Sequence, residues 1–250
     1  VGEYNNSAPP YSMDYSEAIF VQGDYAYVTS LVDDSLTILN ITNKSGPVPV
    51  GEYVDSDLPY SLDGTRGIFV LGNYSYVTSY TDDSLTILNI TNKSGPKPVG
   101  DYSDSEPPYS LDGAWDVFVE GDFAYVTSYD DDSLTVLNVS DKSNPFPVGS
   151  YGNYSALPYS LEQANAVHVL DGYAYVSSSV DDSINVIDID TYLPAGIYTS
   201  QIFDLGFIGI WQNISWVNVS EPRTNVTFQV RSCNDVDCEG ETLVGPDNTN

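Results

Sequence analysis

The apolar residues of this chain fall in short runs that alternate with turns rich in Gly, Asp, Asn, Ser and Pro. The runs Ile19–Val21 and Leu36–Leu39 are typical, because they are rich in β-branched and aromatic residues and are bounded by turn residues. No window keeps an apolar period of about 3.6 residues, and the frequent prolines would interrupt any long helix. The pattern therefore predicts an all-β fold.

One segment of the pattern is repeated without change, because Asp33–Pro47 and Asp82–Pro96 both read DDSLTILNITNKSGP. The same frame returns as DDSLTVLNVSDKSNP from Asp131 and as DDSINVIDID from Asp181. The start positions 33, 82, 131 and 181 are separated by 49, 49 and 50 residues. A fixed period of this size indicates stacked or radially arranged modules.

Each module has the content of one β-propeller blade, four short antiparallel strands in about 50 residues. A lone small sheet buries too little apolar surface to be stable, and packing blades face to face solves that problem. We therefore predict a β-propeller of four ~49-residue repeats over residues 1–192. The expected repeats are about 1–50, 51–99, 100–148 and 149–192.

The segment GDYAYVTSLVDDSLTILNIT and its copies resemble the LVIVD-type propeller repeat, with a looser likeness to the YVTN repeats of archaeal surface proteins. The resemblance covers roughly residues 1–190. It implies a propeller on the outside of a cell and no single chemistry. Such families usually carry more repeats than the four visible in this chain.

The period is lost from about Ile197, and alternating apolar and polar residues through Ile214–Val217 and Val226–Val230 predict a second β domain over 193–250. This stretch resembles the start of a β-sandwich module of large archaeal and bacterial surface proteins. About 50 residues are few for an independent core. We expect either that a partner supplies missing strands or that the chain is a piece of something longer.

The first residues, Val1, Gly2, Glu3 and Tyr4, match Val50–Tyr53 and Val99–Tyr102, which end a repeat. In the fourth repeat, Leu193–Gly196 replaces the matching strand, so we predict that the first four residues dock there. Within one chain, docking would close a four-bladed ring; between chains, it would build a filament by strand addition. The start on a module's last strand, with no initiator Met, signal peptide or transmembrane run, also suggests a processed or excised polypeptide.

The charge of the chain limits the kinds of molecule that it can bind. It has 36 Asp and Glu against 7 Lys and Arg, which gives a formal charge of −29. Such a chain repels phosphate backbones and anionic membranes, which excludes nucleic-acid binding. The acidic excess is also compatible with a salty environment.

Sequons for N-glycosylation are frequent and indicate an extracellular location. We expect glycans on some of these asparagines, Asn43 and Asn92 first: Asn5, Asn43, Asn73, Asn92, Asn153, Asn213, Asn218 and Asn225. Asn40, Asn89 and Asn138 lie inside a predicted strand, where a purely structural role is the alternative. A chain rich in Asn, Ser and Thr also makes sequons by chance.

The two cysteines, Cys233 and Cys238, have a spacing that suits a disulfide across a hairpin tip in an extracellular protein. The intervening loop carries Asp235, Asp237 and Glu239 on alternate residues, which partly resembles a calcium loop. An acidic turn is the alternative reading. Ca²⁺ is the one cofactor that the sequence suggests.

No catalytic residue can be proposed from the sequence, and we predict that the chain is not an enzyme. The single histidine, His168, stands where the other repeats have a phenylalanine, so we expect a packed ring. The Asp pairs that begin at Asp33, Asp82, Asp131 and Asp181 occur once per repeat at a predicted turn, where Asp is favoured. Spread around a ring, they would not converge on one bond as a glycosidase pair must.

The repeats diverge just before the first strand of each predicted blade, at Glu17, Arg66, Trp115 and Asn165. First strands line the channel of a propeller, so these side chains would ring one mouth of it. Their chemistry resembles a small polar or sugar-binding site; drift in exposed loops is the alternative.

The sequence therefore predicts an extracellular structural protein of a cell-surface layer, stalk or filament. Its main partner would be itself, and it could be adhesive toward surface glycans. The alternative is a glycan- or ligand-binding propeller, and a polysaccharide lyase or hydrolase ranks third.

Overall fold

The computed structural model describes residues 2–6, 10–54, 60–104, 109–152 and 160–189. The chain divides into two compact units, Val1–Pro194 and Ala195–Asn250. The second unit, with the predicted sandwich domain over 193–250, lies outside the described residues.

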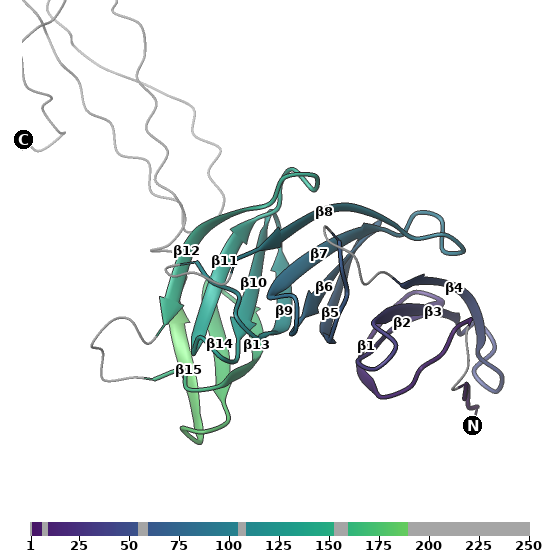
Figure 1. Ribbon diagram of the computed structural model, residues 1–250, viewed down its shortest axis with the longest axis horizontal. Coiled ribbons are helices and arrows are strands. Elements are labelled where there is room, and N and C mark those ends of the chain that lie inside the picture. The colour runs from purple at the N-terminus through teal and green to yellow at the C-terminus, as the bar shows by residue number, and fades with distance from the viewer. Residues whose placement is uncertain (1, 7–9, 55–59, 105–108, 153–159, 190–250) are drawn as a thin grey trace, which may run out of the picture. The chain divides into compact units, whose positions relative to one another are not determined.

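The described residues form four antiparallel sheets and no helix, so the all-β, propeller-type prediction is confirmed (Figure 1). We call the sheets blades 1 to 4, in chain order. Blades 1 and 2 consist of β1 (Ser16–Gln22), β2 (Tyr25–Ser30), β3 (Ser35–Asn40), β4 (Val48–Val54), β5 (Thr65–Leu71), β6 (Tyr74–Ser79), β7 (Ser84–Asn89) and β8 (Lys97–Ser103). Blades 3 and 4 consist of β9 (Ala114–Glu120), β10 (Phe123–Ser128), β11 (Ser133–Asn138), β12 (Phe146–Gly152), β13 (Ala164–Leu170), β14 (Tyr173–Ser178) and β15 (Ser183–Asp188).

Within each blade, every strand pairs with the next one along the chain. The turn before the second strand has a positive φ, as at Gly23 (59°) and Gly72 (61°), which glycine adopts without strain. The second Asp of each pair also has a positive φ, for example 48° at Asp34. Asp tolerates that conformation better than most residues, so the turn role predicted for the pairs is confirmed.

Three apolar clusters join neighbouring blades and form the core. The first packs Tyr27, Leu36 and Ile38 of blade 1 against Ile68 and Val70 of blade 2. Equivalent residues join blade 2 to blade 3 and blade 3 to blade 4. The first strands β1, β5, β9 and β13 contact one another in that order.

An aromatic ladder runs across these first strands through Phe20, Phe69, Phe118 and His168. Successive ring centroids lie 4.9, 4.8 and 4.7 Å apart. His168 thus replaces a ring, as predicted, but it ends the ladder and its side chain is exposed.

Blade 4 has three strands in the described residues, where the other blades have four. The predicted docking of the first four residues on this blade is not seen, because no pairing joins residues 2–6 to β15. Gly2 instead lies against Lys44 and Ser45 of blade 1, and the Tyr4 hydroxyl donates to the Tyr11 carbonyl at 3.2 Å. The docking on blade 4 remains a prediction.

Candidate functional site

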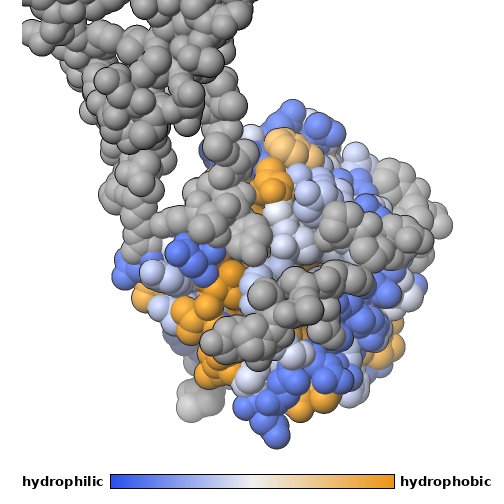
Figure 2. Space-filling model, turned by 90° about the vertical axis from the view of Figure 1, so that its left-hand side faces the viewer, coloured by the Kyte–Doolittle hydropathy of each residue, from blue (hydrophilic) through white to orange (hydrophobic). Residues whose placement is uncertain are grey.

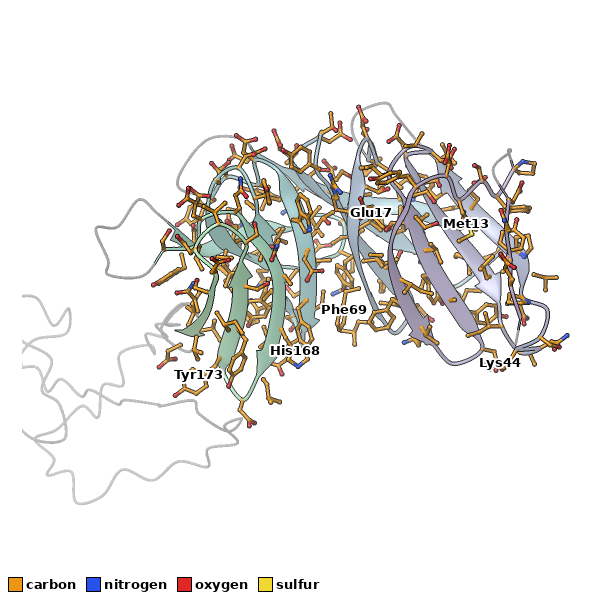
Figure 3. All side chains as sticks on the ribbon, turned by 90° about the horizontal axis from the view of Figure 1, so that it is seen from below. Met13, Glu17, Lys44, Phe69, His168 and Tyr173 are labelled. Atoms are coloured by element: carbon orange, nitrogen blue, oxygen red, sulfur yellow. The ribbon has the colours of Figure 1, made fainter. Side chains whose placement is uncertain are left out.

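The four divergent residues Glu17, Arg66, Trp115 and Asn165 lie together, on β1, β5, β9 and β13. They line one hollow of about 130 Å³, with Ala18, Gly67 and Asp116. Figure 3 shows Glu17 near one end of the first strands, away from Phe69 and His168. We call this group the mouth cluster.

Arg66 is the centre of the mouth cluster. Its Nη1 lies 2.5 Å from Glu17 Oε1, and its guanidinium lies over the Trp115 ring, 4.2 Å from the centroid. A stacked and paired guanidinium of this kind is typical of arginine rather than lysine. Arg66 Nε is buried and has no hydrogen-bond partner among the described residues.

Two tyrosines extend the cluster on the aromatic side. Trp115 stacks on Tyr129 with centroids 4.6 Å apart and an interplanar angle of 24°. Tyr80 meets Trp115 edge-on and donates its hydroxyl to Asp130 at 2.7 Å. This hydrogen bond, followed by burial, raises the pKa of Tyr80 to about 12, so the phenol stays protonated as a donor.

Asp116 is a member of the cluster that the sequence reasoning missed. Its carboxylate accepts from the Val117 N–H at 2.9 Å and from the Val167 N–H at 3.0 Å, so it ties blade 3 to blade 4. Burial raises the pKa of Asp116, and the two backbone hydrogen bonds oppose that rise. The signal was present, because Ala or Gly occupies this position in the other repeats.

Most polar side chains of the cluster already have a bonding partner. Asn165 Oδ1 accepts from the Ser177 hydroxyl at 2.7 Å, and Arg66 and Glu17 neutralise each other. The hollow of about 130 Å³ is also smaller than ligand pockets, which span roughly 300–1,000 Å³. The hollow could accept a small polar group beside Arg66, but it does not offer space for a sugar chain.

The Asp pairs have a second role that the sequence did not reveal. The first Asp bonds its own blade, as when Asp33 Oδ2 accepts from the Asp14 N–H at 2.6 Å. The second Asp reaches the next blade, where Asp34 Oδ1 accepts from the Gly64 N–H at 2.9 Å. We call this hydrogen bond from a backbone N–H of the next blade to the second Asp the latch. It recurs between Gly113 and Asp83 and between Gln163 and Asp132. Burial is the largest cause of the raised pKa of Asp34 and Asp83.

The described sequon asparagines fall into two groups. Asn5, Asn43, Asn73 and Asn92 are exposed. Asn40, Asn89 and Asn138 end strands, and each accepts a hydrogen bond from a backbone N–H two residues later. The remaining predicted sites lie outside the described residues: Asn153, Asn213, Asn218, Asn225, the cysteines Cys233 and Cys238, and the acidic loop Asp235, Asp237 and Glu239.

Within the part of the chain that the structure describes, no group of three or more His, Cys, Asp or Glu side chains could hold a metal ion. No helix among the same residues is long and apolar enough to span a bilayer.

Three segments of the chain match the LVIVD repeat model, at residues 15–55, 64–104 and 113–153. Among curated proteins, none matches this sequence. These segments cover blades 1 to 3, which have four strands each.

Several solved structures share the fold at low sequence identity. The computationally designed Ika4 protein has a TM-score of 0.52 at 8% identity, over 76% of this chain and 99% of that one. Hydrazine synthase of Kuenenia stuttgartiensis has a TM-score of 0.55 at 14% identity, over 72% of this chain and 47% of that one. A streptogramin B lyase has a TM-score of 0.52 at 13% identity, over 73% of this chain and 53% of that one.

The chain thus spans about half the length of the hydrazine synthase and the streptogramin B lyase chains. Identities this low carry the fold and no activity. Together with the four antiparallel sheets, the three repeat matches show that this chain carries LVIVD repeats on a β-propeller-type fold.

Proposed function

We propose that this chain is an extracellular structural protein, a self-assembling segment of a surface layer, stalk or filament of the archaeal type. The observation that carries the proposal is that the residues shared by the repeats make the contacts between neighbouring blades. The Asp latches and the apolar positions of β3, β7 and β11 join one blade to the next. Duplication has therefore kept the contacts of a scaffold, while the mouth cluster has diverged.

The exposed sequons support an extracellular location. In Asn43-Lys44-Ser45, the Ser45 N–H and hydroxyl donate to Asn43 Oδ1 at 3.1 and 2.8 Å. The third repeat makes the same turn with Asp141, which has no amide nitrogen. The turn therefore needs only the oxygen, and a glycan on the Asn43 nitrogen would leave its hydrogen bonds in place.

Native protein tests this role through its mass and its location. We expect an intact mass above the 27.3 kDa of the bare chain, glycopeptides at Asn43 and Asn92, and labelling of intact cells by a membrane-impermeant reagent. Asn138 serves as an internal control, since it is half-buried at the end of β11, whereas Asn43 and Asn92 are exposed. Unmodified protein recovered from inside the cell would contradict the proposal.

Ligand binding at the mouth cluster is the second candidate, and one observation favours it. Four residues from four repeats, Glu17, Arg66, Trp115 and Asn165, line one hollow. The ligand class would be a small polar molecule or a terminal sugar, and glycan adhesion would be its use. The size of the hollow makes it the weaker candidate.

Calorimetry with a panel of small sugars and carboxylates tests the ligand role. We expect saturable binding that Arg66→Lys weakens at least tenfold, because lysine cannot stack and pair as the guanidinium does. Lys97→Arg, at an exposed position of the outer strand β8, is the matched control and should bind as wild type does. Absence of saturable heat with the whole panel would contradict this candidate.

A further inference from the structure

The last described strand, β15, exposes apolar side chains at positions that are buried in the other three blades. Ile184 is 73% exposed and Val186 is 59% exposed. The equivalent residues of β3, β7 and β11 are at most 3% exposed: Leu36, Ile38, Leu85, Ile87, Leu134 and Val136. Figure 2 looks onto the side on which β15 lies in Figure 1 and shows apolar side chains gathered there. We call this surface the tail face.

The first strand, β1, shows the opposite half of the same pattern. Ile19 is 65% exposed and Val21 is 54% exposed. The equivalent residues of β5, β9 and β13 are at most 8% exposed, because each packs against the preceding blade: Ile68, Val70, Val117, Val119, Val167 and Val169. We call this surface the head face. In every internal joint, a head face covers a tail face.

The polar latch of the joint is also divided between the two ends. Asp182 stands at the latch position of blade 4, with a φ of 50°, and no described residue donates to its carboxylate. Tyr15 stands at the donor position of blade 1, with a φ of 59° close to the 71° of Gly64. The Tyr15 N–H has no acceptor among the described residues. One end therefore holds the acceptor of a latch, and the other end holds its donor.

The segment Gly2–Tyr4, which is equivalent in sequence to part of the outer strand β4, lies at the head face. A β-carbon on Gly51 would collide with the Lys93 carbonyl oxygen of the next blade, and one on Gly2 would collide with the Lys44 carbonyl oxygen in the same way. The Tyr4 hydroxyl donates to Tyr11 O at 3.2 Å, as Tyr53 donates to Tyr60 O at 3.3 Å. Gly2–Tyr4 therefore occupies the place that the outer strand of a preceding blade would take.

On the tail face, no described strand pairs with the outer side of β15. A hollow of about 260 Å³ is lined there by Tyr151, Ile184, Asn185 and Val186. In blade 1, Leu36 pairs with Tyr53 and Ile38 pairs with Gly51. The same register on β15 would pair Ile184 with Tyr4 and Val186 with Gly2.

We propose that a second copy of this chain docks head to tail. The head face of one copy packs on the tail face of the other, and its Gly2–Tyr4 segment pairs with β15 of that copy as an outer strand. A second copy is the partner that fits, because the head face and the tail face each carry one half of the contacts that form the three internal joints. These contacts are the apolar packing, the latch and the pairing of the outer strand. Blades 1 and 4 of one chain do not cover each other, since Ile19 and Ile184 are both exposed. The inference rests on the self-assembling role proposed above and names its interface.

Sedimentation velocity of the full chain over a range of concentrations tests the joint. We expect wild-type protein to associate, and Val21→Glu and Ile184→Glu each to weaken that association at least about 30-fold, as for hot-spot residues. Val48→Glu is the matched control, since Val48 is 55% exposed on the outer strand β4. All three positions are exposed in the single chain, so the fold should be kept in each variant, as circular dichroism would show.

Mixing the two face variants gives the decisive result. Each retains one intact face, so an equimolar mixture should form a dimer that grows no further. Gly2→Ala should weaken wild-type association by adding a β-carbon against the Lys44 backbone, whereas Gly46→Ala, which meets only Asn43 Nδ2 at 3.4 Å, should not. Whether wild-type protein forms a closed ring of copies or an open filament, the assembly supports the joint if the variants and their mixture behave as described above.

Other occupants of the faces would give different results. Monomeric wild type at all concentrations overturns the proposal, whether the chain closes its own ring or residues 190–250 cover β15. Association that Ile184→Glu abolishes and Val21→Glu leaves intact would indicate a tail-to-tail contact and would also overturn it. If the chain does not associate head to tail but carries glycans and is labelled on intact cells, the interface is wrong and the proposed extracellular role stands. If it associates head to tail but carries no glycan and is not labelled, the extracellular role is wrong and the interface stands.

Discussion

At the scale of the single residue, the Asp pairs show how one short side chain can join two blades. Asp83 Oδ1 accepts from the Gly113 N–H at 2.9 Å, and the donor lies 30 residues further along the chain. The latch satisfies a backbone amide at the edge of the next blade, where no strand partner is available to it. An unsatisfied amide in such a place costs about as much as a lost hydrogen bond.

Asp83→Ala should therefore lower the free energy of unfolding by about 1–3 kcal/mol, because the Gly113 N–H loses its acceptor. Asp182→Ala is the control in dilute protein. It sits at the same repeat position with a nearly equal φ, 50° against 51°, so the backbone cost of alanine cancels in the comparison. Urea unfolding of both variants measures the difference; equal values would show that the latch adds nothing.

The mouth cluster illustrates the same point for charged residues. Sequence comparison between repeats found Glu17, Arg66, Trp115 and Asn165, because they vary where the neighbouring residues do not. It did not reveal that Arg66 forms an ion pair with Glu17 or that its guanidinium lies over the Trp115 ring. Those contacts decide how much of the site is left for a ligand.

At the scale of the element, close backbone approach decides which glycines of the outer strands are needed. A β-carbon on Gly100 would collide with the Lys142 carbonyl oxygen and would lie 3.0 Å from Ser143 Cα of the next blade. A flexible side chain could move away, but a neighbouring backbone held in its own turn cannot. The Pro-Val-Gly motif that ends each of the first three repeats therefore reflects blade packing.

Gly100→Ala should destabilise the protein by about 1–3 kcal/mol, the usual cost of overpacking a close contact. Gly95→Ala is the matched control, since its β-carbon would meet only Asn92 Nδ2, at 3.4 Å. We expect the control to unfold at or slightly above the wild-type temperature, because alanine restricts the unfolded chain. Thermal unfolding followed by circular dichroism compares the two; an equal loss in both would contradict the packing argument.

At the scale of the whole molecule, acidity links stability to pH. Burial is the largest cause of the raised pKa of Asp34, Asp83 and Asp116. In the window from their ordinary value of 3.8 up to the raised values, the folded state binds more protons than the unfolded chain. The contribution of these groups to stability is therefore present at the acidic side of the window and is lost as the pH rises through the raised values.

The free energy of unfolding should thus increase as the pH falls from about 7 toward about 4, helped by the relief of repulsion at a net charge of −29. Asp116→Asn should flatten this rise. Asp141→Asn, with both variants produced without N-glycosylation, removes the same charge from an exposed site whose pKa is lowered by hydrogen bonds from Ser143, so it should not flatten the rise. Urea unfolding at several pH values tests this, and equal slopes in the two variants would contradict the assignment.

The sequence by itself determined the parts of this protein that depend on local pattern. The strands and turns were predicted from short runs of β-branched and aromatic residues bounded by turn residues, and the repeats from the offsets of 49, 49 and 50 residues. The ring role of His168 and the grouping of the mouth residues followed from aligning one repeat on another.

The tertiary structure alone decided which copies of a residue are covered. Ile38 and Val186 are equivalent in sequence, yet one is buried and the other is 59% exposed. Sequence similarity could not separate them, because both carry the same apolar chemistry at the same place in a blade. Burial depends on whether a further blade lies against that face, and the latches and aromatic contacts depend on the same long-range packing. That packing is what exposes one unmatched face at each end of the described blades.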